Sequence, residues 1–173
     1  MLMFGVTAPL AAQPSGSVVA QEAEVRGAAN IKVLANLVHQ ALQNTNFDPL
    51  RVHLADKQVY DGLLQLGSAP VREAIMLYTP DEMLIDFQRG FSNVIRAGMV
   101  LEVNWNQTEL KFITADATPL EEAVILPVQL HLSSPGSPGF IVQFNAALLD
   151  GRYFYLPPLF IPNQDLDLSL IHI

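Results

Sequence analysis

Two long segments in the second half of the chain alternate between apolar and polar side chains, which is the period of a β-strand. The first covers residues 124–132 and the second covers residues 140–148. Asp150-Gly151 follows directly and is a dipeptide that favours a two-residue hairpin turn, so we expect the chain to return through residues 152–156. The prolines beyond that point exclude a central strand there: Pro157, Pro158 and Pro162. This half of the chain is predicted to form antiparallel hairpins.

Shorter segments extend the strand count. Residues 99–105 alternate and, after a turn at Asn106-Gln107, lead into residues 110–113. The remaining strand candidates are residues 50–55, 58–66 and 71–78, and the tail at Leu166, Leu168 and Leu170. About eight strands without βαβ alternation predict a mainly β chain: a single antiparallel jelly-roll β-barrel or sandwich with one or two helices in its crossings. An α+β fold is the alternative.

Two segments of the first half carry the helical period. Residues 30–43 place Ile31, Leu34, Val38 and Leu42 on one face, with Asn30 as the predicted N-cap. Residues 80–97 follow a capping box, Thr79-Pro80-Asp81-Glu82, and end before Gly98, where a C-terminal cap is expected. We expect these two helices in the crossings of the barrel.

Composition and charge exclude several classes of protein. Half of the residues are hydrophobic and 15% are charged, which excludes a disordered chain. Nine Lys+Arg against 17 Asp+Glu give a net charge of −8, so the chain has no overall attraction to nucleic acid. The absence of cysteine excludes disulfides and thiolate nucleophiles. Together with 12 prolines, it is also compatible with a hot habitat.

The first 21 residues form an uncharged arm. Arg26 is the first basic residue, whereas a secretory signal begins with positive charge. Pro9, Gln13 and Pro14 interrupt the apolar sequence too early for a membrane span, which needs about 20 apolar residues. We therefore predict an apolar N-terminal arm at residues 1–21 and one β-barrel domain at residues 22–173.

Motifs for catalysis and for cofactors are missing from the sequence. There is no G-x-S-x-G elbow and no glycine-rich phosphate loop. The histidines are too far apart for a helical metal-binding pair: His39, His53, His131 and His172. Asp165 and Asp167 share one strand face, but no calcium loop surrounds them. We predict no enzymatic activity, no cofactor and no metal site.

Two alternatives stay open. One is a carbohydrate-binding β-sandwich in which Trp105, or Tyr153 and Tyr155, stack against sugar rings. The other is a metal-dependent jelly-roll enzyme that uses His53, His131 and a carboxylate.

Apolar side chains lie on both faces of the predicted strands. Those on the nominally outer faces are Ile125, Pro127, Ile141, Ala147 and Leu149. One face of a two-layer antiparallel sheet is normally polar, so another element or another subunit must cover these residues. We predict a subunit interface formed by Met1, Leu2, Phe4, Val6, Leu10, Tyr153, Phe154, Tyr155, Leu159, Phe160, Leu168, Leu170 and Ile173. Strand exchange between partners would pair edges that are otherwise open.

Three parts of the sequence then suggest a family: MVLEVNWNQTELKFI (99–113), the pair of segments 122–132 and 139–149, and DGRYFYLPPLFIP (150–162). With the size of the chain, its apolar arm and its lack of cysteine, they resemble the smaller major capsid protein of tailless icosahedral bacteriophages that contain an internal membrane and infect thermophilic bacteria. The resemblance implies a structural virion protein with an upright single jelly-roll barrel. It would form dimers or larger assemblies and pack with a larger capsid subunit over the viral membrane, after a stage in the host cytoplasm.

Overall fold

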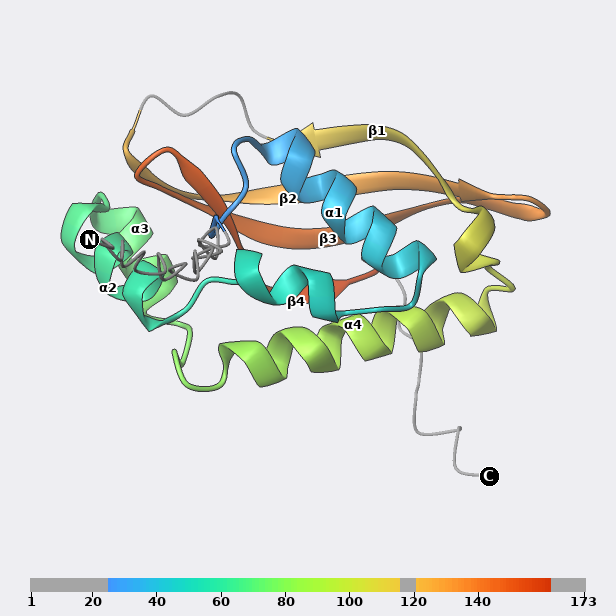
Figure 1. Cartoon of the computed structure of the whole chain (residues 1–173), viewed down its shortest axis with the longest axis horizontal. Helices are drawn as coiled ribbons and strands as arrows, with labels where there is room; N and C mark the ends of the chain where they lie inside the picture. Colours follow the sequence, from blue (N-terminus) through green and yellow to red (C-terminus); the bar gives the residue numbers. More distant parts are fainter. Residues whose placement is uncertain (1–24, 116–120, 163–173) are drawn as a thin grey trace, which may run out of the picture.

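A computed structural model of the chain describes residues 25–115 and 121–162, and in these residues all helices precede the strands (Figure 1). The helical part contains α1 (Ile31–Gln43), the 3₁₀-helix η1 (Asp48–His53), α2 (Lys57–Leu66), α3 (Ala69–Ile75), α4 (Met83–Val100) and the 3₁₀-helix η2 (Trp105–Gln107). The strands β1 (Glu109–Ala115), β2 (Ala123–Ser134), β3 (Ser137–Leu149) and β4 (Arg152–Phe160) then form one antiparallel sheet in chain order. Helices followed by an antiparallel sheet define the α+β class.

The predicted jelly roll of about eight strands is therefore wrong, because the described residues form one sheet of four strands. Of the segments 50–55, 58–66 and 71–78, residues 50–53, 58–66 and 71–75 are helical instead. In α2 the Asp56 side chain caps the helix by accepting a hydrogen bond from the backbone N–H of Val59 (3.1 Å). Val59 and Leu63 are both buried and lie one helical turn apart. A strand would also place residues 59 and 63 on one face, but Asp61 would then share that face. In the helix Asp61 points to another side, where it pairs with Lys57 (2.8 Å).

The prediction that residues 99–105 form the first strand of a hairpin is also wrong. Helix α4 continues to Val100, and the chain turns at Glu102, which has a φ of 57°, into η2. Gly98 lies inside the helix, and the ring of Trp105 packs against it. A Cβ at Gly98 would lie 2.4 Å from that ring. Gly98 is thus a packing position and not a helix cap.

Several predicted elements are confirmed. Helix α1 begins at Ile31, and the Asn30 side chain accepts a hydrogen bond from the backbone N–H of Val33 (2.9 Å). Strands β2 and β3 pair antiparallel over almost their whole length. Asp150 and Gly151 connect β3 to β4 with φ values of 50° and 72°, the positive signs of a type I′ turn.

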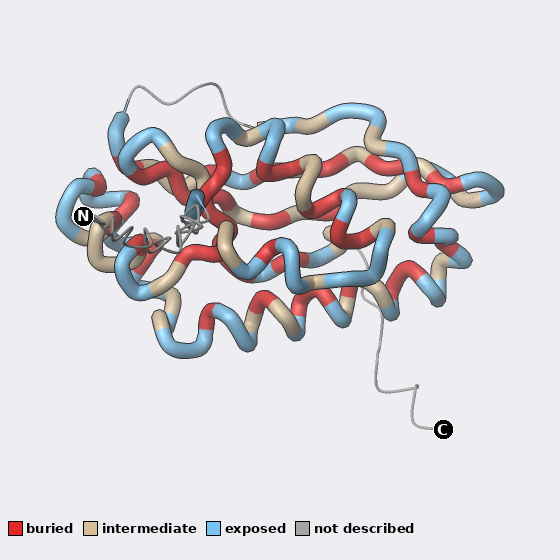
Figure 2. Tube along the Cα trace, viewed as in Figure 1, coloured by how far each residue is buried: buried red, intermediate tan, exposed pale blue. Residues whose placement is uncertain are grey.

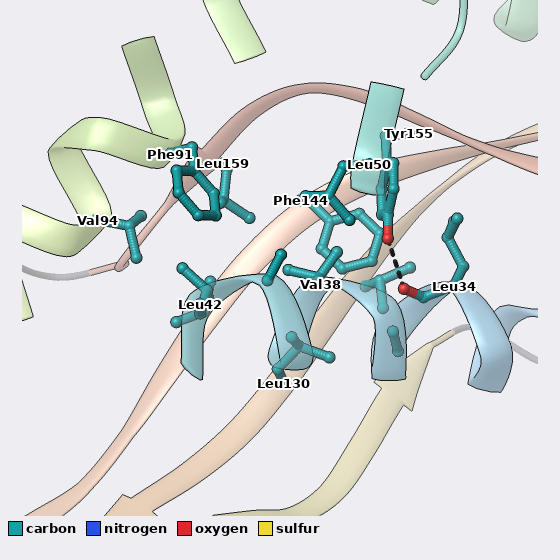
Figure 3. Close-up of a cluster of buried hydrophobic side chains, with 14 of the residues drawn as sticks. Leu34, Val38, Leu42, Leu50, Phe91, Val94, Leu130, Phe144, Tyr155 and Leu159 are labelled. Atoms are coloured by element: carbon teal, nitrogen blue, oxygen red, sulfur yellow. Dashed lines mark hydrogen bonds between the residues drawn. The ribbon is translucent and has the colours of Figure 1, made fainter. Parts of the chain in front are cut away.

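The larger hydrophobic core lies between one face of the sheet and the helices α1 and α4. Figure 2 shows that the buried parts of both helices lie on the sides that face the sheet. Leu34 and Val38 of α1, Phe144 of β3 and Phe91 of α4 all belong to this core, and in Figure 3 Phe91 lies beside Leu159 of β4. At the centre, the hydroxyl of Tyr155 donates a hydrogen bond to the carbonyl oxygen of Leu34 (2.6 Å), so that this buried polar group is satisfied.

A second core covers only one end of the opposite face. Val59 and Leu63 of α2 and Val71 and Ile75 of α3 pack against residues of β2, β3 and β4, namely Ala123, Ile125, Ala147, Leu149, Phe154 and Leu156. These two helices therefore cover part of the apolar outer face that the sequence indicates. Pro127 is exposed and Ile141 is half-buried, and both lie outside this second core. Residues 25–115 and 121–162 therefore leave part of the second sheet face uncovered.

Both described edges of the sheet discourage further strand pairing. On the β4 side, Ala28 pairs with Tyr153, the Ala55 N–H donates to Tyr155, and Pro157 and Pro158 have no N–H to offer. On the β1 side, the register shifts at an irregularity between Leu110 and Phe112, where exposed Lys111 forms an ion pair with Glu109. Bulges and charged lysines protect edges from pairing. The predicted strand exchange therefore gains no support from either edge.

Candidate binding groove

A groove of about 600 Å³ lies between α4 and the C-terminal half of β4. This volume is in the range of pockets that hold small molecules or several side chains of a peptide. One side is lined by α4, another by residues 157–161, and the connection between α3 and α4 contributes Leu77, Tyr78 and Thr79. The groove therefore combines three segments that are distant in the sequence.

A glycine in α4 allows the helix to pack closely against β4 beside the groove. A Cβ at Gly90 would lie 2.8 Å from the carbonyl oxygen of Leu159, so only glycine lets the helix and strand backbones approach this closely. Asp86, Asn93 and Ala97 line the same groove at helical spacing and share one side of α4. The close approach at Gly90 thus holds α4 against β4 where this side of the helix lines the groove.

The charged side chains of the groove are mostly acidic. Asp86 Oδ1 lies 2.9 Å from a guanidinium nitrogen of Arg89, and both side chains are about half exposed. Such an exposed pair adds little stability, and it leaves both groups accessible from solvent. Glu82 adds a second carboxylate, so the described lining residues contain two carboxylates and one guanidinium. The wall has a net negative charge at neutral pH.

Large apolar side chains lie exposed beside this polar wall. Leu77, in the connection between α3 and α4, is 86% exposed, and Phe160 at the end of β4 is 37% exposed. Both line the groove. Apolar side chains grouped on a surface and bordered by polar groups are characteristic of interaction sites.

Tyr78, in the connection between α3 and α4, also lines the groove. Its hydroxyl oxygen accepts a hydrogen bond from the side-chain amide of Asn145 on β3 (3.0 Å). Burial raises the pKa of Tyr78 above its ordinary value, although the hydrogen bond from Asn145 acts in the opposite direction. The hydroxyl therefore stays protonated at neutral pH and can donate a hydrogen bond to a ligand in the groove.

Five of the predicted interface residues lie in the described part of β4. Phe154, Tyr155 and Leu159 are buried within this chain's own two cores, which accounts for their apolar character. Tyr153 is half-buried, and Phe160 lines the groove. The other predicted interface residues lie outside the described residues: Met1, Leu2, Phe4, Val6, Leu10, Leu168, Leu170 and Ile173. A subunit interface at these positions stays a prediction.

The residues proposed for the two alternative functions are not brought together. Trp105 is 5% exposed and Tyr155 is fully buried, so neither ring presents a face to a sugar. His53 is the last residue of η1 and His131 lies in β2, and no group of three or more metal-ligating side chains occurs in residues 25–115 and 121–162. His172 lies outside the described residues.

Comparisons with known proteins yield no relative: no family model matches the sequence, and neither a curated protein nor a solved structure matches the chain. Over the part of the chain that the structure describes, no helix is long and apolar enough to cross a membrane.

Sequence reasoning missed the groove, although part of its signal is visible in the sequence. Glu82, Asp86, Asn93 and Ala97 recur at intervals of three to four residues or their multiples, beside an internal glycine at Gly90. In the sequence, Glu82 reads as part of a capping box and Gly90 as an unfavourable helical residue. That these residues line one groove follows only from the packing of β4 against this side of α4.

Proposed function

We propose that this chain is a binding module that holds an extended peptide segment of a partner protein in the groove between α4 and β4. The observation that carries the proposal is the pairing of an acidic helical wall with exposed apolar side chains, Leu77 and Phe160. A segment that carries both basic and apolar side chains complements these two features. The donors of Arg89 and Asn93 can bind carbonyl oxygens of such a segment.

The prolines of β4 favour binding through side chains. Pro157 and Pro158 line the groove and have no N–H, so a peptide cannot add to β4 as a regular fifth strand at these positions. Recognition in the groove then depends on apolar side chains that contact Leu77 and Phe160 and on cationic groups that pair with Glu82 and Asp86.

A fluorescently labelled peptide of alternating leucine and lysine tests this proposal. We expect saturable binding by fluorescence anisotropy, and weaker binding by a peptide of alternating leucine and glutamate. Leu77→Ser and the double variant Glu82→Gln/Asp86→Asn are each expected to weaken binding about fivefold, which corresponds to about 1 kcal/mol.

Leu66→Ser is the matched control, because Leu66 is also an exposed leucine (54%) but lies on α2 and does not line this groove. Equal affinities for the wild type and both groove variants would refute the proposal. Failure of the leucine–lysine peptide to bind at concentrations of about 1 mM would refute it as well.

The virion role, the larger capsid partner and the viral membrane stay predictions. The family resemblance that led to them implies a jelly-roll barrel, and the four-stranded sheet of this chain is not one. What still supports assembly into a larger particle is the low share of charged residues and the apolar arm.

A further inference from the structure

The part of the second sheet face that the described helices do not cover carries an ordered set of uncharged side chains, which we name the open sheet face. It consists of two rows across β1, β2 and β3, as given by the strand register: Phe112, His131 and Ile141 in one row, and Thr114, Gln129 and Gln143 in the other. Side chains of paired residues in neighbouring strands lie on the same face. None of the six is a carboxylate, a lysine or an arginine.

Contacts within the two rows hold these side chains in place. The rings of Phe112 and His131 stack with a centroid distance of 3.9 Å and an interplanar angle of 18°. His131 Nε2 lies 3.0 Å from the hydroxyl of Thr114, and the amide of Gln129 donates to the amide oxygen of Gln143 (3.2 Å). Phe112 nevertheless stays 57% exposed. The open sheet face is therefore a preorganised surface with a large exposed aromatic ring.

We infer that two copies of this chain pack against each other through the open sheet face. A two-fold interface brings each patch against its own copy, so the patch must be self-complementary. Amides meet this condition because each has donors and an acceptor, and aromatic rings meet it because they stack on one another. A patch of one charge sign does not meet it.

The net charge of the chain restricts which surface two copies can share. With a net charge of −8, two copies repel each other at most orientations. The six residues of the open sheet face include no carboxylate, and the adjoining pair of Glu109 and Ser133 carries one that is ion-paired with Lys111. Two copies can therefore meet there without burying unpaired like charges. Because both sheet edges are protected, we expect face-to-face packing and not a continuous eight-stranded sheet. This inference does not depend on peptide binding in the groove.

Sedimentation analysis of the full chain tests the inference. We expect a species of twice the 19.0 kDa chain mass, with a concentration-dependent dissociation. Phe112→Asp places a buried charge in each half of the interface and is expected to weaken dimerisation at least about tenfold. Val33→Asp is the matched control: Val33 is an exposed apolar residue (42%) on α1, which packs on the opposite face of the sheet.

A wild-type chain that stays monomeric up to about 1 mM would overturn the inference, since even an association of about 4 kcal/mol is visible there. A dimer that Phe112→Asp and Val33→Asp leave equally stable would also overturn it, because the contact would then lie elsewhere. Circular dichroism establishes that both variants fold.

Site-specific cross-linking gives a second readout, since the chain has no cysteine of its own. A short bismaleimide reagent is expected to give covalent dimers of Thr114→Cys on the open sheet face. It is expected to give none with Ser92→Cys, which is exposed on α4. Equal cross-linking of the two variants, or none of Thr114→Cys, would contradict face-to-face packing.

Discussion

Two buried polar side chains connect the helical layer to the start of the sheet. The hydroxyl of Thr108 donates to the carbonyl oxygen of Trp105 (2.8 Å), and His39 Nε2 lies 3.1 Å from the same hydroxyl oxygen. Because the hydroxyl proton points to Trp105, His39 donates to Thr108 through a protonated Nε2. This chain of bonds joins the middle of α1 to the residue that precedes β1.

The burial of His39 makes stability depend on pH. Burial lowers the pKa of His39, and its hydrogen bonding with Thr108 acts in the opposite direction without cancelling this effect. As the pH falls through about 6.5, the unfolded chain gains a proton on this residue and the folded chain does not, so stability decreases. We expect a loss of at most about 1.4 kcal/mol per pH unit between pH 6.5 and the folded pKa. Urea unfolding of the wild type and of His39→Gln at pH 7.5 and 5.5 measures it, and the variant should show the smaller pH dependence. Equal dependence in both proteins would show that another group is responsible.

Tyr155 has a structural hydroxyl. Tyr155→Phe removes the 2.6 Å hydrogen bond to Leu34 but keeps the ring, and we expect a loss of about 0.5–1.5 kcal/mol in the free energy of unfolding. Tyr153→Phe, two residues away on the same strand and only half-buried, is the control and is expected to stay within about 0.5 kcal/mol of the wild type. If the control loses as much as Tyr155→Phe, the hydrogen bond is not the cause.

At the scale of the element, α4 shows how one glycine decides where a helix can pack. Alanine favours a helix over glycine by about 1 kcal/mol, so propensity alone predicts that Gly98→Ala stabilises the protein. The structure predicts the opposite, because the new Cβ would collide with the Trp105 ring at 2.4 Å. We expect a net destabilisation of about 1–3 kcal/mol.

The single tryptophan makes this prediction directly measurable. Displacement of Trp105 from its buried position shifts its fluorescence to longer wavelength in Gly98→Ala. Ser92→Ala, at an exposed position of the same helix, should leave the emission unchanged. An unshifted spectrum together with increased stability would show that the helix has room for the methyl group.

At the scale of the whole molecule, the described helices cover both faces of the sheet at one end and only one face at the other end. The central pair β2–β3 contributes to both cores, whereas β1 is an edge strand that contributes only to the larger core. We expect the amides of β2 and β3 that bond to each other to exchange slowest in native-state hydrogen exchange, and those of β1 faster. Slower exchange in β1 than in β3 would contradict this order.

Local sequence patterns were sufficient to predict α1, β2, β3 and the turn between β3 and β4. In each case the signal lies within a few residues: the Asn30 cap, the two-residue period, and the Asp150-Gly151 turn. They were insufficient for the segments that became α2 and α3. Short apolar segments with valine, isoleucine and tyrosine fit either a strand or a helix, and only the layer on which they pack decides between the two.

The sequence alone establishes that this chain is acidic, rich in apolar residues and equipped with more apolar strand surface than one core needs. It does not establish what covers that surface, because a hydrophobic period says that a side chain is buried without saying against which partner. Tertiary packing placed α2 and α3 over one end of the second sheet face and left the open sheet face beside them. It also brought β4 against Gly90 of α4 to form the groove. Both candidate surfaces therefore arise from contacts between residues that are far apart in the chain.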